Sequence, residues 1–185
     1  MKRKNIGLLV GSLRKDSFSK KAAQAICALM PESIKIKPIE IGHLPLYNQD
    51  FDDNGLLPES YEDFRREVKE LDGVMIITPE YNRSYPAVLK NALDIASRPP
   101  ADNAWSGKPG AVISVSPGKL GAFGANHHLR QVLVCLNIYA MPQPEAYIGG
   151  IDNLLDKDGK TKEESTEEFF QRIADQFVSW VNRFE

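Results

Sequence analysis

The sequence predicts an α/β protein in which helices cover both faces of one parallel sheet. Apolar runs with the length of strands alternate with segments of helical periodicity, as in parallel sheets with right-handed crossovers. The run at 74–77, Val-Met-Ile-Ile, is apolar at every position, as in strands covered on both faces. No repeat or low-complexity tract interrupts the alternation. These three observations together predict a doubly wound sheet.

Five segments are predicted to be strands: 5–10, 33–41, 73–78, 110–116 and 139–148. The first, third and fourth are short apolar runs, which suits the interior of a sheet. Segment 33–41 alternates apolar and polar residues and contains Pro38, which cannot donate to a ladder, so we expect an exposed or edge strand. Prolines also interrupt segment 139–148.

Five segments are predicted to be helices: 18–30, 59–71, 86–97, 123–136 and 166–184. The first has apolar residues at helical spacing and stops before Pro31, and the third ends before Pro99 and Pro100. The second is mostly polar, and the last is amphipathic with Thr166 as its candidate N-cap. The remaining long segments are predicted to be surface loops: 42–58 and 152–168.

Composition points to one globular domain, residues 1–185, because 42% of the residues are hydrophobic and 26% are charged. With 23 basic and 25 acidic residues the net charge is −2, so neither nucleic acid nor a membrane surface is an expected partner. No apolar stretch approaches the length of a transmembrane helix. Cys27 and Cys135 have apolar neighbours and no metal-ligand spacing, so both are expected to be reduced core residues. A cytoplasmic protein is expected.

The stretch directly after the first strand has the chemistry of a phosphate site. Residues 11–19, Gly-Ser-Leu-Arg-Lys-Asp-Ser-Phe-Ser, connect a buried strand to a helix start. Backbone N–H groups at a helix start lack partners and carry partial positive charge, serine hydroxyls add donors, and Arg14 can pair with a phosphate. The loop matches neither a P-loop nor the Gly-x-Gly-x-x-Gly fingerprint, so a mononucleotide phosphate fits better. An ordinary strand-to-helix turn is the alternative.

Two further loops are expected at the same edge of the sheet, where ligands lie beyond the carboxyl ends of the strands. Segment 78–86 carries prolines, an asparagine and two tyrosines, and the rings of Tyr81 and Tyr85 suit a planar heterocycle. Segment 116–124 holds three glycines, which let a backbone approach a ligand closely. Taken alone, each segment also fits an ordinary loop that connects a strand to a helix without binding a ligand.

At these loops the chain resembles the NAD(P)H-dependent FMN reductases, a group that includes quinone, chromate and azo-dye reductases. The resemblance extends over nearly the whole chain, and two motifs are its most specific parts: Gly11-Ser12-Leu13-Arg14-x-x-Ser17-x-Ser19 and Pro79-Glu80-Tyr81-Asn82-x-Ser84-x-Pro86-x-x-Leu89-Lys90-Asn91-Ala92-x-Asp94. It implies a flavodoxin-like fold with a five-stranded parallel sheet in the order 2-1-3-4-5. It also implies FMN as cofactor, NAD(P)H as co-substrate, and a homodimer or homotetramer.

The resemblance also implies a role in FMN binding for each loop. The phosphate is expected at Ser12, Arg14, Ser17 and Ser19, with backbone from Phe18. The isoalloxazine is expected between one set of residues from the second loop (Pro79, Glu80, Tyr81, Asn82 and Ser84) and another from the third (Ser116 and Gly118). Two positions depart from the family's pattern or vary within it. They are Ala122 and Arg83. The methyl group of Ala122 is expected to narrow the approach to the flavin, and Arg83 is a cation expected beside the flavin, where it would favour either an anionic acceptor or the phosphate of NADPH.

Such a site needs no catalytic side chain, because the hydride chemistry belongs to the cofactor. We expect reduction by NAD(P)H at an open face, followed by transfer of two electrons to a small acceptor such as a quinone, chromate, an azo compound or flavin. Backbone N–H groups of 80–82 and 116–118 are expected to face the flavin's polar edge. Glu80 is expected to supply main chain or a subunit contact. The alternatives are an FMN-binding electron carrier and a flavin-free scaffold.

No metal site is expected. The side chains of His127 and His128 diverge by about 100° on a helix, so both are predicted to be surface residues. The carboxylates of Asp50, Asp52 and Asp53 lack the spacing of a calcium-binding loop and are predicted to lie in a solvated turn.

Overall fold

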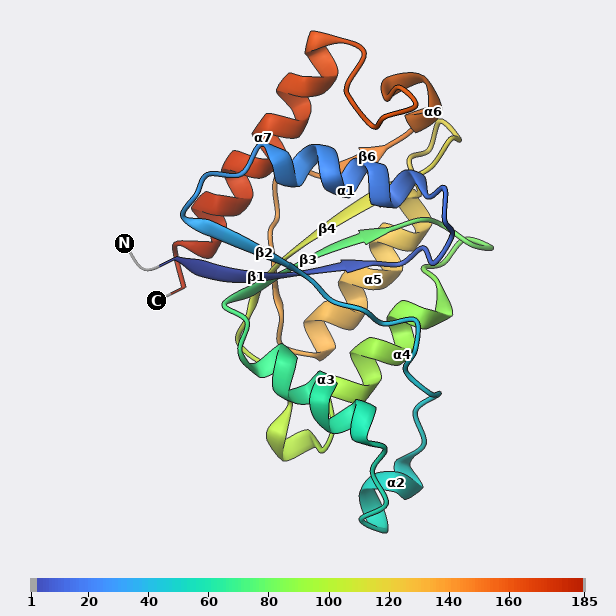
Figure 1. The fold of residues 1–185 in the computed structure, drawn as a ribbon, viewed down its shortest axis with the longest axis vertical. Helices are drawn as coiled ribbons and strands as arrows, with labels where there is room; N and C mark the ends of the chain where they lie inside the picture. Colours follow the sequence, from blue (N-terminus) through green and yellow to red (C-terminus); the bar gives the residue numbers. More distant parts are fainter. Residues whose placement is uncertain (1–2, 185) are drawn as a thin grey trace.

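The computed structural model describes residues 3–184, and these contain six parallel strands in one sheet (Figure 1). They are β1 (Lys4–Val10), β2 (Ile34–Pro38), β3 (Gly73–Thr78), β4 (Pro109–Val115), β5 (Tyr139–Ala140) and β6 (Ala146–Ile148). The order is β2-β1-β3-β4-β5, and β6 also pairs with β4. The predicted order and the edge position of β2 are confirmed. The predicted fifth strand is split in two, because Pro142 and Pro144 have no N–H to donate.

Helices cover both faces of this sheet (Figure 1). On one face lie α1 (Phe18–Ala28) and α7 (Glu164–Val181). On the other face lie α3 (Glu59–Lys69), α4 (Ala87–Ala96) and α5 (Phe123–Cys135). The predicted doubly wound architecture is therefore confirmed, with two apolar cores divided by the sheet.

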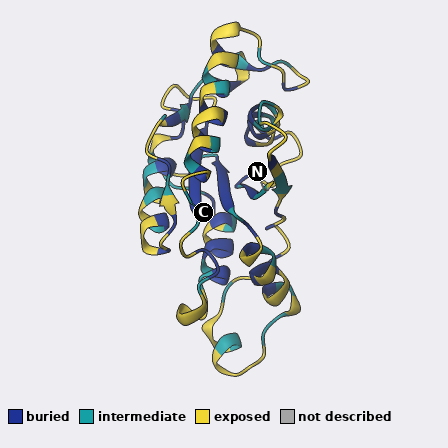
Figure 2. Cartoon of the chain, turned by 90° about the vertical axis from the view of Figure 1, so that its left-hand side faces the viewer, coloured by how far each residue is buried: buried dark blue, intermediate teal, exposed yellow. Residues whose placement is uncertain are grey.

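The side chains of β3 show how the sheet separates the two cores. Val74 and Ile76 pack with α3, α4 and α5, whereas Met75 and Ile77 pack with α1 and α7. Every residue of β3 is buried, which explains why its sequence is continuously apolar. Figure 2 shows the buried strands between helices whose outer faces are exposed.

Short helices occur in segments that were predicted to be loops. They are α2 (Gln49–Asp53) and α6 (Ile151–Leu154), and a 3-10 turn η1 (Pro100–Asp102) follows α4. The predicted N-cap of the last helix is wrong, because α7 begins at Glu164 and Thr166 is buried within its first turn. Among residues 3–184, no helix combines the length and the apolar character that a membrane span requires.

The predicted solvated turn is wrong for Asp52. Its carboxylate accepts two hydrogen bonds from the Arg65 guanidinium, from Nη1 at 2.8 Å and from Nη2 at 3.0 Å. The Arg65 Nε–H donates to the carbonyl oxygen of Ile95 at 2.9 Å. Asp50 and Asp53 are exposed, as predicted. The pair joins residues 13 positions apart, and it forms only once segment 42–58 folds back onto α3.

The two cysteines differ in exposure, so the expectation of two core thiols is wrong for Cys135. Cys135 is exposed at the end of α5, whereas Cys27 is half-buried on α1. Burial raises the pKa of the Cys27 thiol to about 11, which leaves little reactive thiolate near neutral pH. We therefore expect a thiol-reactive dye at pH 8 to label Cys135 first. The fast phase of labelling, assigned to Cys135, should vanish in Cys135→Ser and persist in Cys27→Ser. A fast phase of labelling that survives in Cys135→Ser would contradict the assignment to Cys135.

Candidate functional site

The loops that follow β1, β3 and β4 lie at one edge of the sheet. We call them the first loop (residues 11–17), the second loop (79–86) and the third loop (116–122). β1 and β3 are neighbours although β2 separates them in sequence, so the strand order reverses between them. Ligands of doubly wound sheets bind at such a reversal, beyond the carboxyl ends of the strands.

Glycines allow the second loop to pack against the first loop and against the start of α5. A Cβ on Gly11 would lie 3.2 Å from Pro79 Cδ and 2.6 Å from Leu89 Cδ1, so the first loop approaches the second closely. A Cβ on Gly124, in the first turn of α5, would lie 2.9 Å from the carbonyl oxygen of Arg83. The second loop therefore also contacts the helix that the third loop leads into. The structure brings all three predicted loops together.

The first loop leads into a helix start with spare donors. Ser17 is the N-cap of α1, and its Oγ accepts a hydrogen bond from the Lys20 N–H at 3.2 Å. Within residues 3–184, the N–H groups of Phe18 and Ser19 have no hydrogen-bond partner, as expected for the first turn of a helix. These donors and the helix dipole make this end of α1 suitable for an anion.

Side chains of the first loop add to this donor set. Ser12 and Ser19 are buried, yet their hydroxyls make no hydrogen bond with any residue that the structure describes. Arg14 is exposed, and in the described part of the chain its guanidinium has no ion-pair partner. Asp16 is the one carboxylate of the loop and is exposed. Two hydroxyls, two N–H groups and a guanidinium match the acceptors of a phosphate group.

The second loop is a hairpin turn with two residues at its tip. The Tyr81 N–H donates to the Ser84 carbonyl at 2.8 Å, and the Ser84 N–H donates to the Tyr81 carbonyl at 3.0 Å. The two residues between them, Asn82 and Arg83, have φ values of 50° and 68°. Positive φ at both positions defines a type I′ turn, in which glycine is preferred at the second position. Arginine there costs about 1–2 kcal/mol of backbone strain.

The two tyrosines of the second loop have different environments. The Tyr81 side chain is 48% exposed and presents its ring at the surface. Tyr85 instead packs against the core beneath α4, and burial raises the pKa of its hydroxyl. Of the two tyrosines, Tyr81 therefore stays the candidate for the predicted aromatic wall, whereas Tyr85 packs against the core.

Glu80 has a role that the sequence did not reveal. Its Oε2 accepts a hydrogen bond from the Ala125 N–H at 3.1 Å, so the carboxylate caps the start of α5. Its Oε1 lies 3.3 Å from Nη1 of Arg83. Nδ1 of His128 and Oγ of Ser84 form a further hydrogen bond of 3.1 Å between α5 and the hairpin. The hairpin is thereby fixed to α5.

A buried polar network holds the third loop. Ser114, the penultimate residue of β4, donates its hydroxyl to the Gly121 carbonyl at 2.7 Å, and Asn126 Nδ2 donates to the same hydroxyl oxygen at 3.2 Å. Gly149, directly after β6, lets this segment approach the third loop, since a Cβ there would lie 2.6 Å from the carbonyl oxygen of Lys119. Both contacts constrain the path of the third loop across the end of the sheet.

Some of the N–H groups expected to face a ligand are already hydrogen-bonded. The Ser116 N–H donates to the Ile148 carbonyl at 2.9 Å, the Gly118 N–H donates to Ser116 Oγ at 2.9 Å, and the Tyr81 N–H closes the hairpin. The expectation is therefore wrong for these three N–H groups. Within the described residues, the N–H groups of Glu80 and Asn82 have no partner.

Ala122, whose methyl group is predicted to narrow the approach to the flavin, is 2% exposed. Ala122 precedes α5 with φ 60° and ψ 40°, a left-handed conformation. Ala122→Gly relieves about 1–2 kcal/mol of backbone strain, which stabilises the folded state. It also removes a buried methyl group and raises the entropy of the unfolded chain, and these two losses offset that gain. We expect its free energy of unfolding to change by less than about 0.5 kcal/mol, against a loss of about 1.5 kcal/mol in the helical control Ala125→Gly. Urea unfolding measures both; equal losses would contradict the strain at Ala122.

His127 and His128 each hydrogen-bond to a side chain outside α5. His127 Nε2 lies 3.0 Å from the Tyr147 hydroxyl, and its ring centroid lies 4.1 Å from that of Phe123. Tyr147 in turn donates to Glu145 at 3.0 Å. Across residues 3–184, no three histidine, cysteine or acidic side chains are grouped as ligands for a metal ion.

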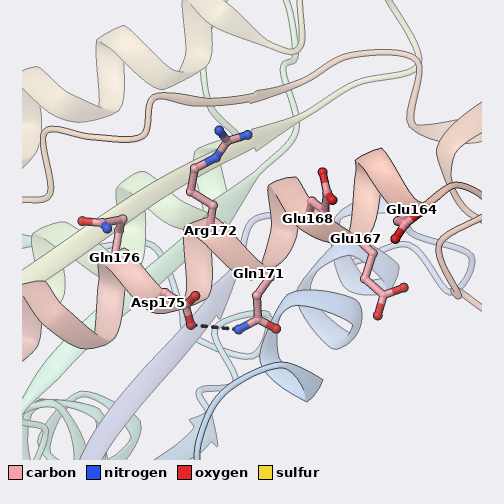
Figure 3. A pocket seen from close by; sticks show the side chains of 7 residues that line it. All are labelled: Glu164, Glu167, Glu168, Gln171, Arg172, Asp175 and Gln176. Carbon is pink, nitrogen blue, oxygen red and sulfur yellow. Dashed lines mark hydrogen bonds between the residues drawn. The ribbon is translucent and has the colours of Figure 1, made fainter.

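A hollow of about 510 Å³ lies along α7, away from the three loops (Figure 3). Four carboxylates and one cation line it, together with two glutamines: Glu164, Glu167, Glu168, Asp175, Arg172, Gln171 and Gln176. Figure 3 shows these side chains spread along the exposed side of one helix, with Gln171 bonded to Asp175 at 2.8 Å. Its excess of carboxylates makes it unsuitable for a phosphate, so the candidate site remains at the loops.

The fold and the loops define a class of protein: a doubly wound α/β protein with a helix start suited to an anion at its strand-order reversal. The model of one family, NADPH-dependent FMN reductase, matches residues 4–153. The chain belongs to this family. The family resemblance expected from the two motifs is therefore confirmed, and so is FMN with NAD(P)H as electron donor.

Relatives match almost the full length of the chain. A quinone reductase from Pseudomonas putida is 50% identical over 177 residues, covering 96% of this chain and 94% of its own. A 2-hydroxy-1,4-benzoquinone reductase from Burkholderia sp is 45% identical and covers 95% of both chains. Among solved structures, FerB, a flavoenzyme NAD(P)H:(acceptor) oxidoreductase from Paracoccus denitrificans, aligns with a TM-score of 0.91, 40% identity and 98% coverage of both chains.

Proposed function

We propose that the chain is an oxidoreductase that holds FMN in its three loops and reduces quinones with NAD(P)H. The overall reaction is NAD(P)H + H⁺ + quinone → NAD(P)⁺ + hydroquinone. The observation that carries the proposal is the donor set at the start of α1, which lies where the strand order reverses. Relatives named as quinone reductases, at 45–50% identity, support quinones as the acceptor class.

The first loop would hold the phosphate of FMN. Ser12 and Ser19 offer hydroxyls, the first turn of α1 offers the N–H groups of Phe18 and Ser19, and Arg14 offers a bidentate cation. Ser17 supports these groups by capping the helix. The arrangement neutralises the phosphate dianion with one full charge and the helix dipole.

The second and third loops would enclose the isoalloxazine. Pro79 and Tyr81 supply apolar and aromatic surface, and Ser116 and Gly118 line the opposite side. The N–H groups of Glu80 and Asn82, which have no partner within the described residues, would donate to the polar edge of the ring system. Ser84 acts by fixing the hairpin, through its bond to His128. Preorganised donors of this kind stabilise developing negative charge without reorganisation.

Bound FMN supplies the redox chemistry, since it accepts a hydride from NAD(P)H and gives two electrons to the acceptor. The protein's task is then to orient both partners at the cofactor and to place charge around it. No side chain of the loops needs to act as acid, base or nucleophile. Chromate, azo compounds and free flavin remain predicted acceptors, and a homodimer or homotetramer remains the predicted assembly.

The electron-carrier alternative is not favoured, because the relatives are named as reductases. Stopped-flow absorbance of the FMN-loaded protein separates the two functions. After anaerobic mixing with NADPH, we expect the flavin absorbance band to disappear. A benzoquinone added next should restore that band. Steady NADPH consumption should follow when both are present.

Two outcomes would contradict the proposal. A flavin that is reduced by dithionite but not by either pyridine nucleotide would identify a carrier. A protein that takes up no FMN at all would instead identify a flavin-free scaffold.

A further inference from the structure

Arg83 combines backbone strain with an unusually available cation. It occupies the second position of the type I′ turn with φ 68°, where glycine would be free of strain. Its side chain is 75% exposed, and its one ion-pair partner among residues 3–184 is Glu80, at 3.3 Å. A strained residue at a site edge that gains no compensating packing indicates a function for its side chain.

Hydrogen bonds fix the turn, so the backbone from which the Arg83 side chain extends has a defined position. The hairpin bonds to itself through Tyr81 and Ser84, and to α5 through Glu80 and His128. Glu80 is 14% exposed and engages Arg83 through a single nitrogen, Nη1. In the described part of the chain, Nη2 and Nε of Arg83 make no hydrogen bond, which leaves part of the donor fork for a ligand.

The three loops carry four exposed cations: Arg14 and Lys15 in the first loop, Arg83 in the second and Lys119 in the third. The proposed function assigns Arg14 to the FMN phosphate. Arg83 is then the one guanidinium of the second loop, beside the exposed ring of Tyr81. The planar fork of arginine matches a phosphate better than the ammonium of Lys119 does.

We propose that Arg83 binds a phosphate group of the pyridine nucleotide donor and thereby sets the affinity for that donor. The inference rests on the proposed function, since it concerns the second ligand of the same site. Both NADH and NADPH carry a pyrophosphate, and NADPH adds a 2′-phosphate. A guanidinium can bind either the pyrophosphate or the 2′-phosphate, and comparing NADH with NADPH distinguishes the two.

Three variants of the FMN-loaded enzyme test the inference by steady-state kinetics. Arg83→Gln removes the charge and keeps the strained backbone, Arg83→Gly removes both, and Arg83→Lys keeps the charge. We expect the KM for NADPH to rise roughly fivefold in the first two and less in the third, with kcat and the Kd for FMN unchanged. Arg172→Gln, which removes an exposed cation from α7, is the matched control and should leave every constant unchanged (Figure 3).

The outcomes separate the possibilities. A rise in the KM for NADPH alone supports contact between Arg83 and the 2′-phosphate. An equal rise in the KM for NADH supports contact with the pyrophosphate. KM values within twofold of the wild type for both donors would overturn the inference, and so would an equal rise in Arg172→Gln. A wild-type enzyme that oxidises neither donor would instead defeat the proposed function, and this inference with it.

Discussion

Arg14→Ala is expected to weaken FMN binding by roughly 10- to 100-fold, the range for loss of a charge-assisted, bidentate phosphate contact. Arg14 is exposed and, within residues 3–184, unpaired, so its removal breaks no contact of the free protein. The loss should therefore appear in binding and not in folding. Fluorescence quenching of FMN measures the Kd, and urea unfolding of the FMN-free protein should give unchanged stability.

Lys15→Ala is the matched control, because Lys15 is an exposed cation in the same loop. We expect its Kd for FMN to stay within about threefold of the wild type, since it loses only long-range attraction. Arg14→Lys should fall between the two, because an ammonium keeps the charge without the planar fork. Equal Kd values for Arg14→Ala and the wild type would mean that the first loop does not hold the phosphate.

Asp52→Ala is expected to lower the free energy of unfolding by about 3 kcal/mol, the lower end for breaking a buried ion pair. The side chains of Arg65 and Asp52 are 10% and 13% exposed, and two hydrogen bonds join them. Without the carboxylate, the guanidinium keeps its hydrogen bond to the Ile95 carbonyl and its contact with the Tyr61 ring, and it remains largely shielded from water with an unpaired charge. Urea unfolding measures the change.

Asp53→Ala, one residue away, is the control for Asp52→Ala. Asp53 is exposed and accepts a hydrogen bond from Gln49 on the same short helix, so its loss should cost less than about 0.5 kcal/mol. The double variant Asp52→Ala/Arg65→Met should be more stable than the sum of the single losses predicts, because it leaves no buried charge unpaired. Strict additivity would show that the pair contributes no coupling.

The sheet could be predicted because its signals are local. The apolar runs of β1, β3 and β4 identify buried strands wherever they occur, and the order of strands followed from the family resemblance. What failed depends on contacts between distant residues. The burial of Asp52 against Arg65 and the exposure of Cys135 are each decided by tertiary packing.

The candidate site shows the same division. The serines and the arginine of the first loop could be predicted, since a strand, a hydroxyl-rich turn and a helix start adjoin in sequence. The bond from Ala125 to Glu80 joins residues 45 positions apart, and no local pattern reveals it. The type I′ turn at Asn82 and Arg83 was also missed, because arginine is a poor sequence signal for a positive φ.

A crystal structure of the FMN complex would show where the phosphate and the ring system bind. We predict that the phosphate accepts hydrogen bonds from the N–H groups of Phe18 and Ser19 and from the Arg14 guanidinium, with the ring system between the second and third loops. A phosphate bound anywhere else, such as in the hollow along α7, would contradict the account.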